Sequence, residues 1–175
     1  ENLHDMYPEI TKEMADEYAM LSQKKTAAAY TEGKIGRMIV PMTVYTPEGW
    51  VVADRDQQPR PDTTIEGLKD LKTPFRPLGN VTPGNASGLN DGACGVLLMA
   101  ADKAKELGIQ AKMRMVAYTY AGVRPEVMGL GPIPATHKVF KISGLSMNDI
   151  DLIEINEAFA SQAIGCMREL GIETD

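Results

Sequence analysis

The sequence predicts an α/β fold, because two separated segments each place a short apolar strand, a polar turn and a helix in succession. The first segment is VTPGNASGLNDGA at residues 81–93, and the second is IDLIEINEAFASQA at residues 150–163. In α/β proteins, ligands meet backbone donors at such strand-to-helix turns. A hydrophobic fraction of 43% over 175 residues is enough to bury a core. The two turns are therefore the candidate ligand sites.

The N-terminal half is predicted to begin with a long helix and a hairpin. Thr11 is suited to cap a helix whose apolar residues recur at helical spacing as far as Gly33. Residues 38–52 alternate as strands do, and the tetrapeptide TPEG at 46–49 favours a tight turn between them. Residues 54–77 are rich in proline and predicted to be irregular, apart from one short helix at 64–71.

The C-terminal half is predicted to alternate strands and helices. The peptides KELGI at 105–109 and RELGI at 168–172 close two of these helices in the same way, each with a glycine. The expected elements are a strand at Val81, a helix at 93–107, a strand at 113–123, a loop at 129–134, a helix at 135–143, a strand at 150–155 and a helix at 157–170.

Composition excludes several classes of function. The net charge of −6 and the absence of a basic patch disfavour binding to nucleic acid or to an anionic membrane. No apolar run reaches membrane-spanning length. Cys94 and Cys166 are the two cysteines and show no CxxC spacing, so neither a disulfide framework nor a metal site is expected. The cytoplasm is the expected compartment.

The glycine-rich turn has two interpretations. Gly84, Gly88 and Gly92 follow the pattern GxxxGxxxG, which is neither a dinucleotide fingerprint nor a P-loop. The polar residues between them are typical of turns, in which their side chains satisfy the neighbouring backbone. Alternatively, the small residues Ala86 and Ser87 let a ligand chain lie close to the backbone.

The second turn, NEAF at residues 156–159, also has two interpretations. Asn156 can be the N-cap of the last helix, with Glu157 favourably placed at the helix dipole. Asn156 is equally suited to stabilise an oxyanion, directly or through a water, because its amide hydrogens stay neutral as negative charge develops.

The histidines and cysteines are expected to have no catalytic role. His4 and His137 are predicted to be surface residues. Cys94 begins the apolar face of the predicted helix at 93–107, where a buried thiol is inert, and Cys166 is predicted to lie in the core.

Three motifs in order, GNASGLNDGA, VMGLGPIPA and NEAFA, resemble those of the thiolases, which make or cleave 3-ketoacyl-CoA. The resemblance runs along the entire chain and implies a layered fold of mixed sheets covered by helices, with an irregular α+β loop domain. It implies a partial CoA-binding loop domain at residues 1–87, the end of the N-terminal core domain at 88–112, and the first part of the C-terminal core domain at 113–175. Only about the middle of a thiolase is expected here, with a further strand beyond Asp175.

The resemblance also assigns roles to residues. Asn156 is similar to the asparagine that holds an oxyanion-hole water, and Phe159 to an aromatic beside the pantetheine arm. Ala86 and Ser87 resemble residues that line the pantetheine tunnel. Arg60 and Phe75 match positions near the CoA nucleotide, and Met128 matches the acyl pocket. Gly67 stands where some thiolases place a polar side chain near the adenine.

In this family a cysteine accepts the acyl group, assisted by a histidine, and a second cysteine moves a proton on acetyl-CoA. These residues are expected before Glu1 and after Asp175, so the chain alone is expected to be inactive. CoA is a substrate, so no cofactor is expected. The complete protein is expected to form a homodimer or homotetramer and to act in fatty acid metabolism. The sequence does not decide the acyl-chain length of its substrate or whether the reaction runs toward synthesis or cleavage. The alternative is a non-catalytic CoA-binding or assembly module.

Overall fold

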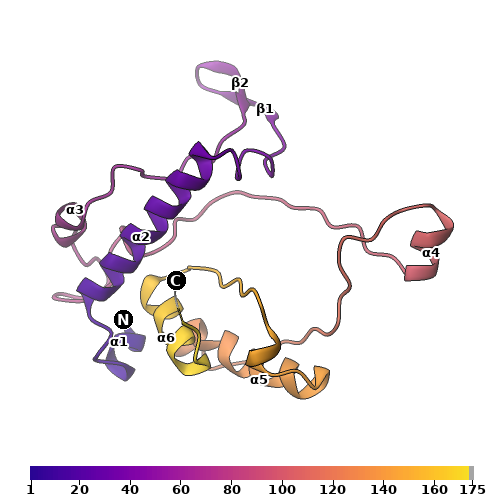
Figure 1. Cartoon of the computed structure of the whole chain (residues 1–175). Coiled ribbons are helices and arrows are strands. Elements are labelled where there is room, and N and C mark those ends of the chain that lie inside the picture. The colour runs from indigo at the N-terminus through magenta and orange to yellow at the C-terminus, as the bar shows by residue number, and fades with distance from the viewer. Residues whose placement is uncertain (174–175) are drawn as a thin grey trace. The chain divides into compact units, whose positions relative to one another are not determined.

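A computed structural model describes residues 1–173 of the chain (Figure 1). The chain divides into two compact units: residues 1–88 and the segment from 155 onward form the first, and residues 89–154 form the second. Two turns far apart in sequence, at 80–88 and at 155–160, therefore belong to the same unit. The three-part division expected from sequence stays a prediction, and the strand expected beyond Asp175 lies outside the described residues.

The first unit is organised along one long helix. A short helix, α1 (Asn2–Met6), precedes α2 (Lys12–Thr31), which is the longest helix in Figure 1. The side chain of Thr11 accepts a hydrogen bond from the Met14 amide at 3.2 Å, which confirms the predicted cap. Beyond the end of α2, Gly33 takes a left-handed conformation (φ 70°), as its position predicts.

The predicted hairpin and the short helix are both confirmed. Strands β1 (Met42–Thr46) and β2 (Gly49–Ala53) pair antiparallel and are the only sheet among residues 1–173. Helix α3 (Ile65–Lys69) follows within the proline-rich segment, and the Thr64 side chain accepts a hydrogen bond from the Gly67 amide at 3.2 Å. Leu68 of α3 is buried within the first unit.

The last helix, α6 (Ala160–Leu170), packs against α1 and α2 (Figure 1). Ala163 and Cys166 on this helix are fully buried, which confirms the predicted core position of Cys166. The helix begins three residues later than predicted, and its N-cap is Phe159 rather than Asn156. The backbone of residues 158–160 is instead engaged with residues 85–87, and a backbone held extended cannot enter a helix.

The second unit contains α4 (Ala101–Glu106), the 3-10 turns η1 (Pro125–Leu130) and η2 (Met147–Asp149), and α5 (Pro132–Ser143). Helix α5 packs on η1. It starts at Pro132 rather than at Ala135, because proline is well suited to the first turn of a helix, where its missing N–H is not needed. The predicted loop at 129–134 is wrong, because η1 extends to Leu130 and only Gly131 separates it from α5.

Several predicted elements do not form. Val81, residues 113–123 and residues 150–155 are not in strands, and residues 93–100 precede α4 without helical structure. A strand needs a neighbour to satisfy its backbone N–H and C=O groups, and among the described residues these segments have none. Apolar side chains such as Val96 and Leu97 are exposed rather than packed, so nothing offsets the cost of ordering a longer helix there.

The two KELGI-type helix ends are confirmed as equivalent. Gly108 (φ 66°) and Gly171 (φ 65°) both adopt the left-handed conformation. In each case the following isoleucine amide bonds back to the carbonyl five residues earlier, at 2.8 Å, as in a Schellman motif. The glycine is needed at both ends because a Cβ disfavours this conformation.

A Cβ at Gly84 is expected to destabilise the first unit. It would overlap the side chain of Leu68 and lie 2.6 Å from Cδ1 of Leu71. We expect Gly84→Ala to lower the free energy of unfolding by about 1–3 kcal/mol, the usual effect of overpacking, measured by urea denaturation. The control is Gly36→Ala, where a Cβ meets no atom within 4 Å. Equal midpoints for the two variants would contradict the packing described here.

Candidate functional site

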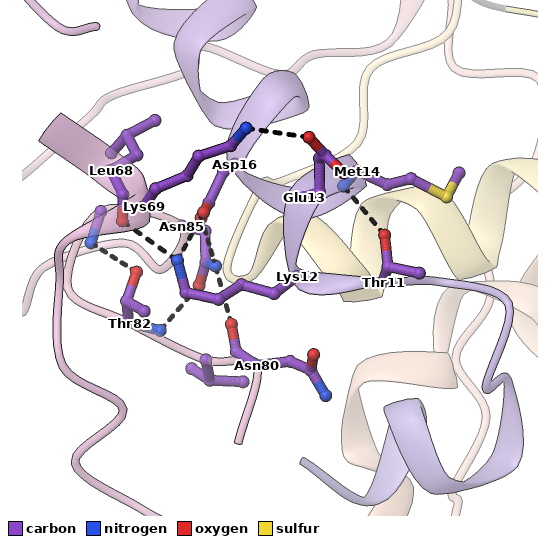
Figure 2. Close-up of polar contacts among 12 residues, drawn as sticks. Thr11, Lys12, Glu13, Met14, Asp16, Leu68, Lys69, Asn80, Thr82 and Asn85 are labelled. Carbon is purple, nitrogen blue, oxygen red and sulfur yellow. Dashed lines mark hydrogen bonds and ion pairs between the residues drawn. The ribbon is translucent and has the colours of Figure 1, made fainter. Parts of the chain in front are cut away.

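The glycine-rich turn is fastened to α2 by a buried carboxylate (Figure 2). Asp16 is 0% exposed and accepts hydrogen bonds from Lys12 Nζ at 2.6 Å and from Asn85 Nδ2 at 2.9 Å. Lys12 Nζ also donates to the Leu68 carbonyl at 3.0 Å. A buried charge is tolerated only when it is paired and hydrogen-bonded, so this arrangement fixes Asn85 against α2.

Asn85 also closes the turn itself. Its Oδ1 accepts a hydrogen bond from the Thr82 amide at 2.9 Å, and its Nδ2 donates to the Asn80 carbonyl at 2.9 Å. The turn interpretation of this asparagine is therefore confirmed, and the same amide also reaches Asp16. Three hydrogen bonds of the Asn85 side chain are thus used for structure, which leaves the following residues to face a ligand.

Glu1 holds the beginning of the same turn. Its carboxylate accepts hydrogen bonds from the amides of Asn80 and Val81 at 3.0–3.1 Å. Partial burial raises the pKa of the Glu1 carboxyl, but the backbone hydrogen bonds from Val81 and Asn80 outweigh it and lower that pKa overall. The turn is thus held from α2 on one side and from the start of the chain on the other.

The two candidate turns meet in one antiparallel bridge. Ala86 pairs with Phe159, the Ser87 amide donates to the Ala158 carbonyl at 2.9 Å, and the Ala160 amide donates to the Asn85 carbonyl at 2.9 Å. Residues more than 70 positions apart in the chain are thereby brought side by side. The bridge also orders the chain immediately before α6.

Two hydroxyl groups of α2 donate hydrogen bonds to the carboxylate of Glu157. Tyr18 Oη donates to Glu157 Oε1 at 2.9 Å, and Ser22 Oγ donates to Glu157 Oε2 at 2.6 Å. Tyr18 and Ser22 are one helical turn apart and therefore lie on one face of α2. Burial, together with the hydrogen bond to Glu157, raises the pKa of the Tyr18 phenol, so the phenol stays a donor.

Four of the predicted site residues lie together around this bridge. Ala86 and Phe159 are half-buried in the bridge itself, Ser87 is exposed directly after it, and Asn156 is exposed shortly before it. An exposed side-chain amide and an exposed hydroxyl can each donate to a carbonyl or to a developing oxyanion.

The other three predicted residues lie elsewhere. The Arg60 amide donates to Gln23 Oε1 of α2 at 2.7 Å, while its guanidinium bonds to carbonyls of residues 57–59. Phe75 is 72% exposed in the segment after α3. Met128 is also exposed, in η1 of the second unit.

The sequence predictions missed the residues of α2 that hold the two turns. Lys12 and Asp16, like Tyr18 and Ser22, are polar pairs spaced i, i+4. This spacing places both residues on one face of a helix but does not reveal what that face contacts.

Two side-chain environments were also predicted wrongly. His4 is buried, with Nδ1 2.5 Å from the Ile10 carbonyl and its pKa lowered by burial, and Cys94 is exposed because the predicted helix around it does not form.

Neither a metal site nor a membrane span is found within residues 1–173. No group of three or more histidine, cysteine or acidic side chains is close enough there to hold a metal ion. No described helix is both long and apolar enough to cross a membrane.

Two family models match the chain. The thiolase N-terminal domain matches residues 1–102, and the thiolase C-terminal domain matches residues 109–175. The chain belongs to the thiolase family. The resemblance of its three motifs to those of the thiolases is thereby confirmed.

The chain is also similar in sequence to individual thiolases. The chain is 46% identical over 167 residues to the 3-oxoadipyl-CoA/3-oxo-5,6-dehydrosuberyl-CoA thiolase of Escherichia coli K12, covering 95% of this chain and 42% of that protein. It is 46% identical over 171 residues to the acetyl-CoA acetyltransferase of Syntrophomonas wolfei, covering 98% of this chain and 43% of that protein. The chain thus spans less than half the length of these relatives.

Solved thiolase structures share its fold. The Bacillus anthracis acetyl-CoA acetyltransferase superposes with a TM-score of 0.93 at 45% identity, covering 98% of this chain and 43% of that one. The human mitochondrial 3-ketoacyl-CoA thiolase gives a TM-score of 0.88 at 36% identity, with the same coverage of each. The predicted family and thiolase-like fold are confirmed.

The two cysteines are expected to differ in reactivity. Burial raises the pKa of the Cys166 thiol, whereas Cys94 is exposed. We expect a thiol reagent such as 5,5′-dithiobis(2-nitrobenzoate) to label Cys94 rapidly and Cys166 only after denaturation. Cys94→Ala is expected to abolish the fast phase, and a fast phase that survives this change would contradict the burial of Cys166.

Proposed function

We propose that this chain forms the CoA-binding surface and one oxyanion element of a thiolase-type acyltransferase. The reaction is 3-ketoacyl-CoA + CoA ⇌ acyl-CoA + acetyl-CoA, through an acyl group carried by a cysteine. The proposal is supported by membership of the thiolase family and by relatives named as acetyl-CoA acetyltransferases and as thiolases of oxoacyl-CoA compounds.

The observation that carries the proposal is the bridge between Ala86 and Phe159. It joins the turn that holds Ser87 to the segment that holds Asn156, so one ligand can meet both. In our proposal the pantetheine arm lies along Ala86, Ser87 and Phe159, where small residues and one aromatic allow close approach to the backbone. The thioester end of that arm is then directed toward Asn156.

Asn156 supplies the chemistry that the chain itself contributes. Acyl transfer between thioesters develops negative charge on a thioester oxygen, and a neutral donor that is already in place stabilises that charge without rearranging. In our proposal Asn156 does this through a bound water. The nucleophilic cysteine, the histidine that assists it and the second cysteine are proposed to come from outside this chain.

The remaining assignments complete the proposal. Arg60 and Phe75 contact the CoA nucleotide, and Met128 lines the acyl pocket. CoA enters as a substrate and no cofactor takes part. The complete enzyme is proposed to be a cytoplasmic homodimer or homotetramer that acts in fatty acid metabolism.

The test uses the protein expressed from the complete reading frame that encodes this chain. We expect it to cleave acetoacetyl-CoA in the presence of CoA, and we expect Asn156→Ala to lower kcat by about 10²–10³-fold, the usual effect of losing one oxyanion donor. Asn148→Ala, a change in η2 of the second unit, serves as the control and is expected to keep the rate of the unmodified protein.

Two results would contradict the proposal. An unmodified protein that binds CoA but has no thiolase activity would favour a non-catalytic CoA-binding module. Activity that is unchanged in Asn156→Ala would remove the oxyanion role from this residue while leaving the CoA-binding surface in place.

A further inference from the structure

The segment that carries Asn156 has few fixed points. Ile155 is where the chain enters the first unit from the second, and residues 152–157 have no regular secondary structure. After Asn156, the first backbone groups held by the first unit are the Ala158 carbonyl and the Ala160 amide. The backbone alone therefore leaves Asn156 two residues away from its nearest anchor.

The side chain of Glu157 provides an anchor next to Asn156. Both of its carboxylate oxygens accept hydrogen bonds from α2, one from Tyr18 at 2.9 Å and the other from Ser22 at 2.6 Å. Two hydrogen bonds to two oxygens fix the orientation of the carboxylate as well as its position. Because Glu157 is the residue next to Asn156, its orientation limits the backbone angles that Asn156 can adopt.

We infer that Tyr18 and Ser22 are positioning residues for the oxyanion element at Asn156, acting through Glu157. This inference rests on the proposed function, since it assigns Asn156 its role. Neither hydroxyl is proposed to contact the reacting atoms. Their contribution is to hold the Asn156 amide where charge develops, and the misplacement of such a group by about 1 Å can cost about 100-fold in rate.

The chain offers a matched control for Tyr18. Tyr7 also donates one phenolic hydrogen bond to a carboxylate, that of Glu169 on α6, at 3.1 Å. Tyr7→Phe and Tyr18→Phe therefore remove the same atom and the same kind of bond. They differ in whether that bond holds the segment of Asn156.

The first measurement is kinetic and uses the complete protein. We expect the double variant Tyr18→Phe, Ser22→Ala to lower kcat by about 10- to 100-fold with little change in KM, because the interaction lost is one made in the transition state. Tyr7→Phe is expected to match the unmodified enzyme. Restoring the second hydroxyl, as Tyr18→Phe with Ser22→Thr, is expected to recover part of the loss. A double variant with unchanged kcat would overturn the inference.

The second measurement does not depend on activity. Hydrogen–deuterium exchange of a peptide covering residues 153–160 is expected to be faster in the double variant than in the unmodified protein, and unchanged in Tyr7→Phe. Unchanged exchange in the double variant would overturn the inference even in a protein without thiolase activity. Faster exchange in a protein without that activity would show that the two hydroxyls hold the segment of Asn156, and it would reject the proposed function together with the oxyanion role.

Discussion

The buried carboxylate of Asp16 is the constraint on which the first unit depends. It has no exposure to water, so its charge must be balanced and hydrogen-bonded within the protein: Lys12 balances the charge, and Asn85 donates a second hydrogen bond. Removing one partner of such a pair commonly costs about 3–5 kcal/mol, because the other charge is left uncompensated. The glycine-rich turn is therefore held against α2 by a requirement of the core.

From this contact the rest of the candidate site follows in order. Asn85, fixed by Asp16, presents its carbonyl to the Ala160 amide and its neighbour Ala86 to Phe159. The bridge fixes the start of α6 from one side, and α2 reaches the same segment from the other through Tyr18 and Ser22. One helix thus supports both turns that the family resemblance assigns to the CoA ester. Rigid elements that support a site in this way keep its polar groups in place.

Short sequence patterns correctly predicted those features of the fold that depend only on neighbouring residues. The cap at Thr11, the hairpin turn at residues 46–49 and the two left-handed glycines each depend on a few neighbouring residues, and all are confirmed. The start of α6 was predicted wrongly because it is set by pairing with residues 85–87, a contact that no local pattern reveals. Residues 113–123 alternate as a strand does, and residues 150–155 are apolar enough for a buried strand, but pairing partners decide whether such segments become strands. At the candidate site, motifs predict roles for Asn156 and Ser87, whereas the side chains that hold the two turns are found only once α2 is placed.

The central claim is that one buried carboxylate orders both turns, and amide exchange tests it most directly. Asp16→Asn keeps the size of the side chain but removes its charge and leaves Lys12 or Asn85 without an acceptor. We expect the amides of Ser87 and Ala160, which form the bridge, then to exchange at least about tenfold faster, the factor given by 1.4 kcal/mol of local opening. Glu13 lies on α2 like Asp16 but forms an exposed ion pair with Lys69 of α3, so Glu13→Gln is expected to leave both amides unchanged. Unaltered protection of Ser87 and Ala160 in Asp16→Asn would contradict the claim.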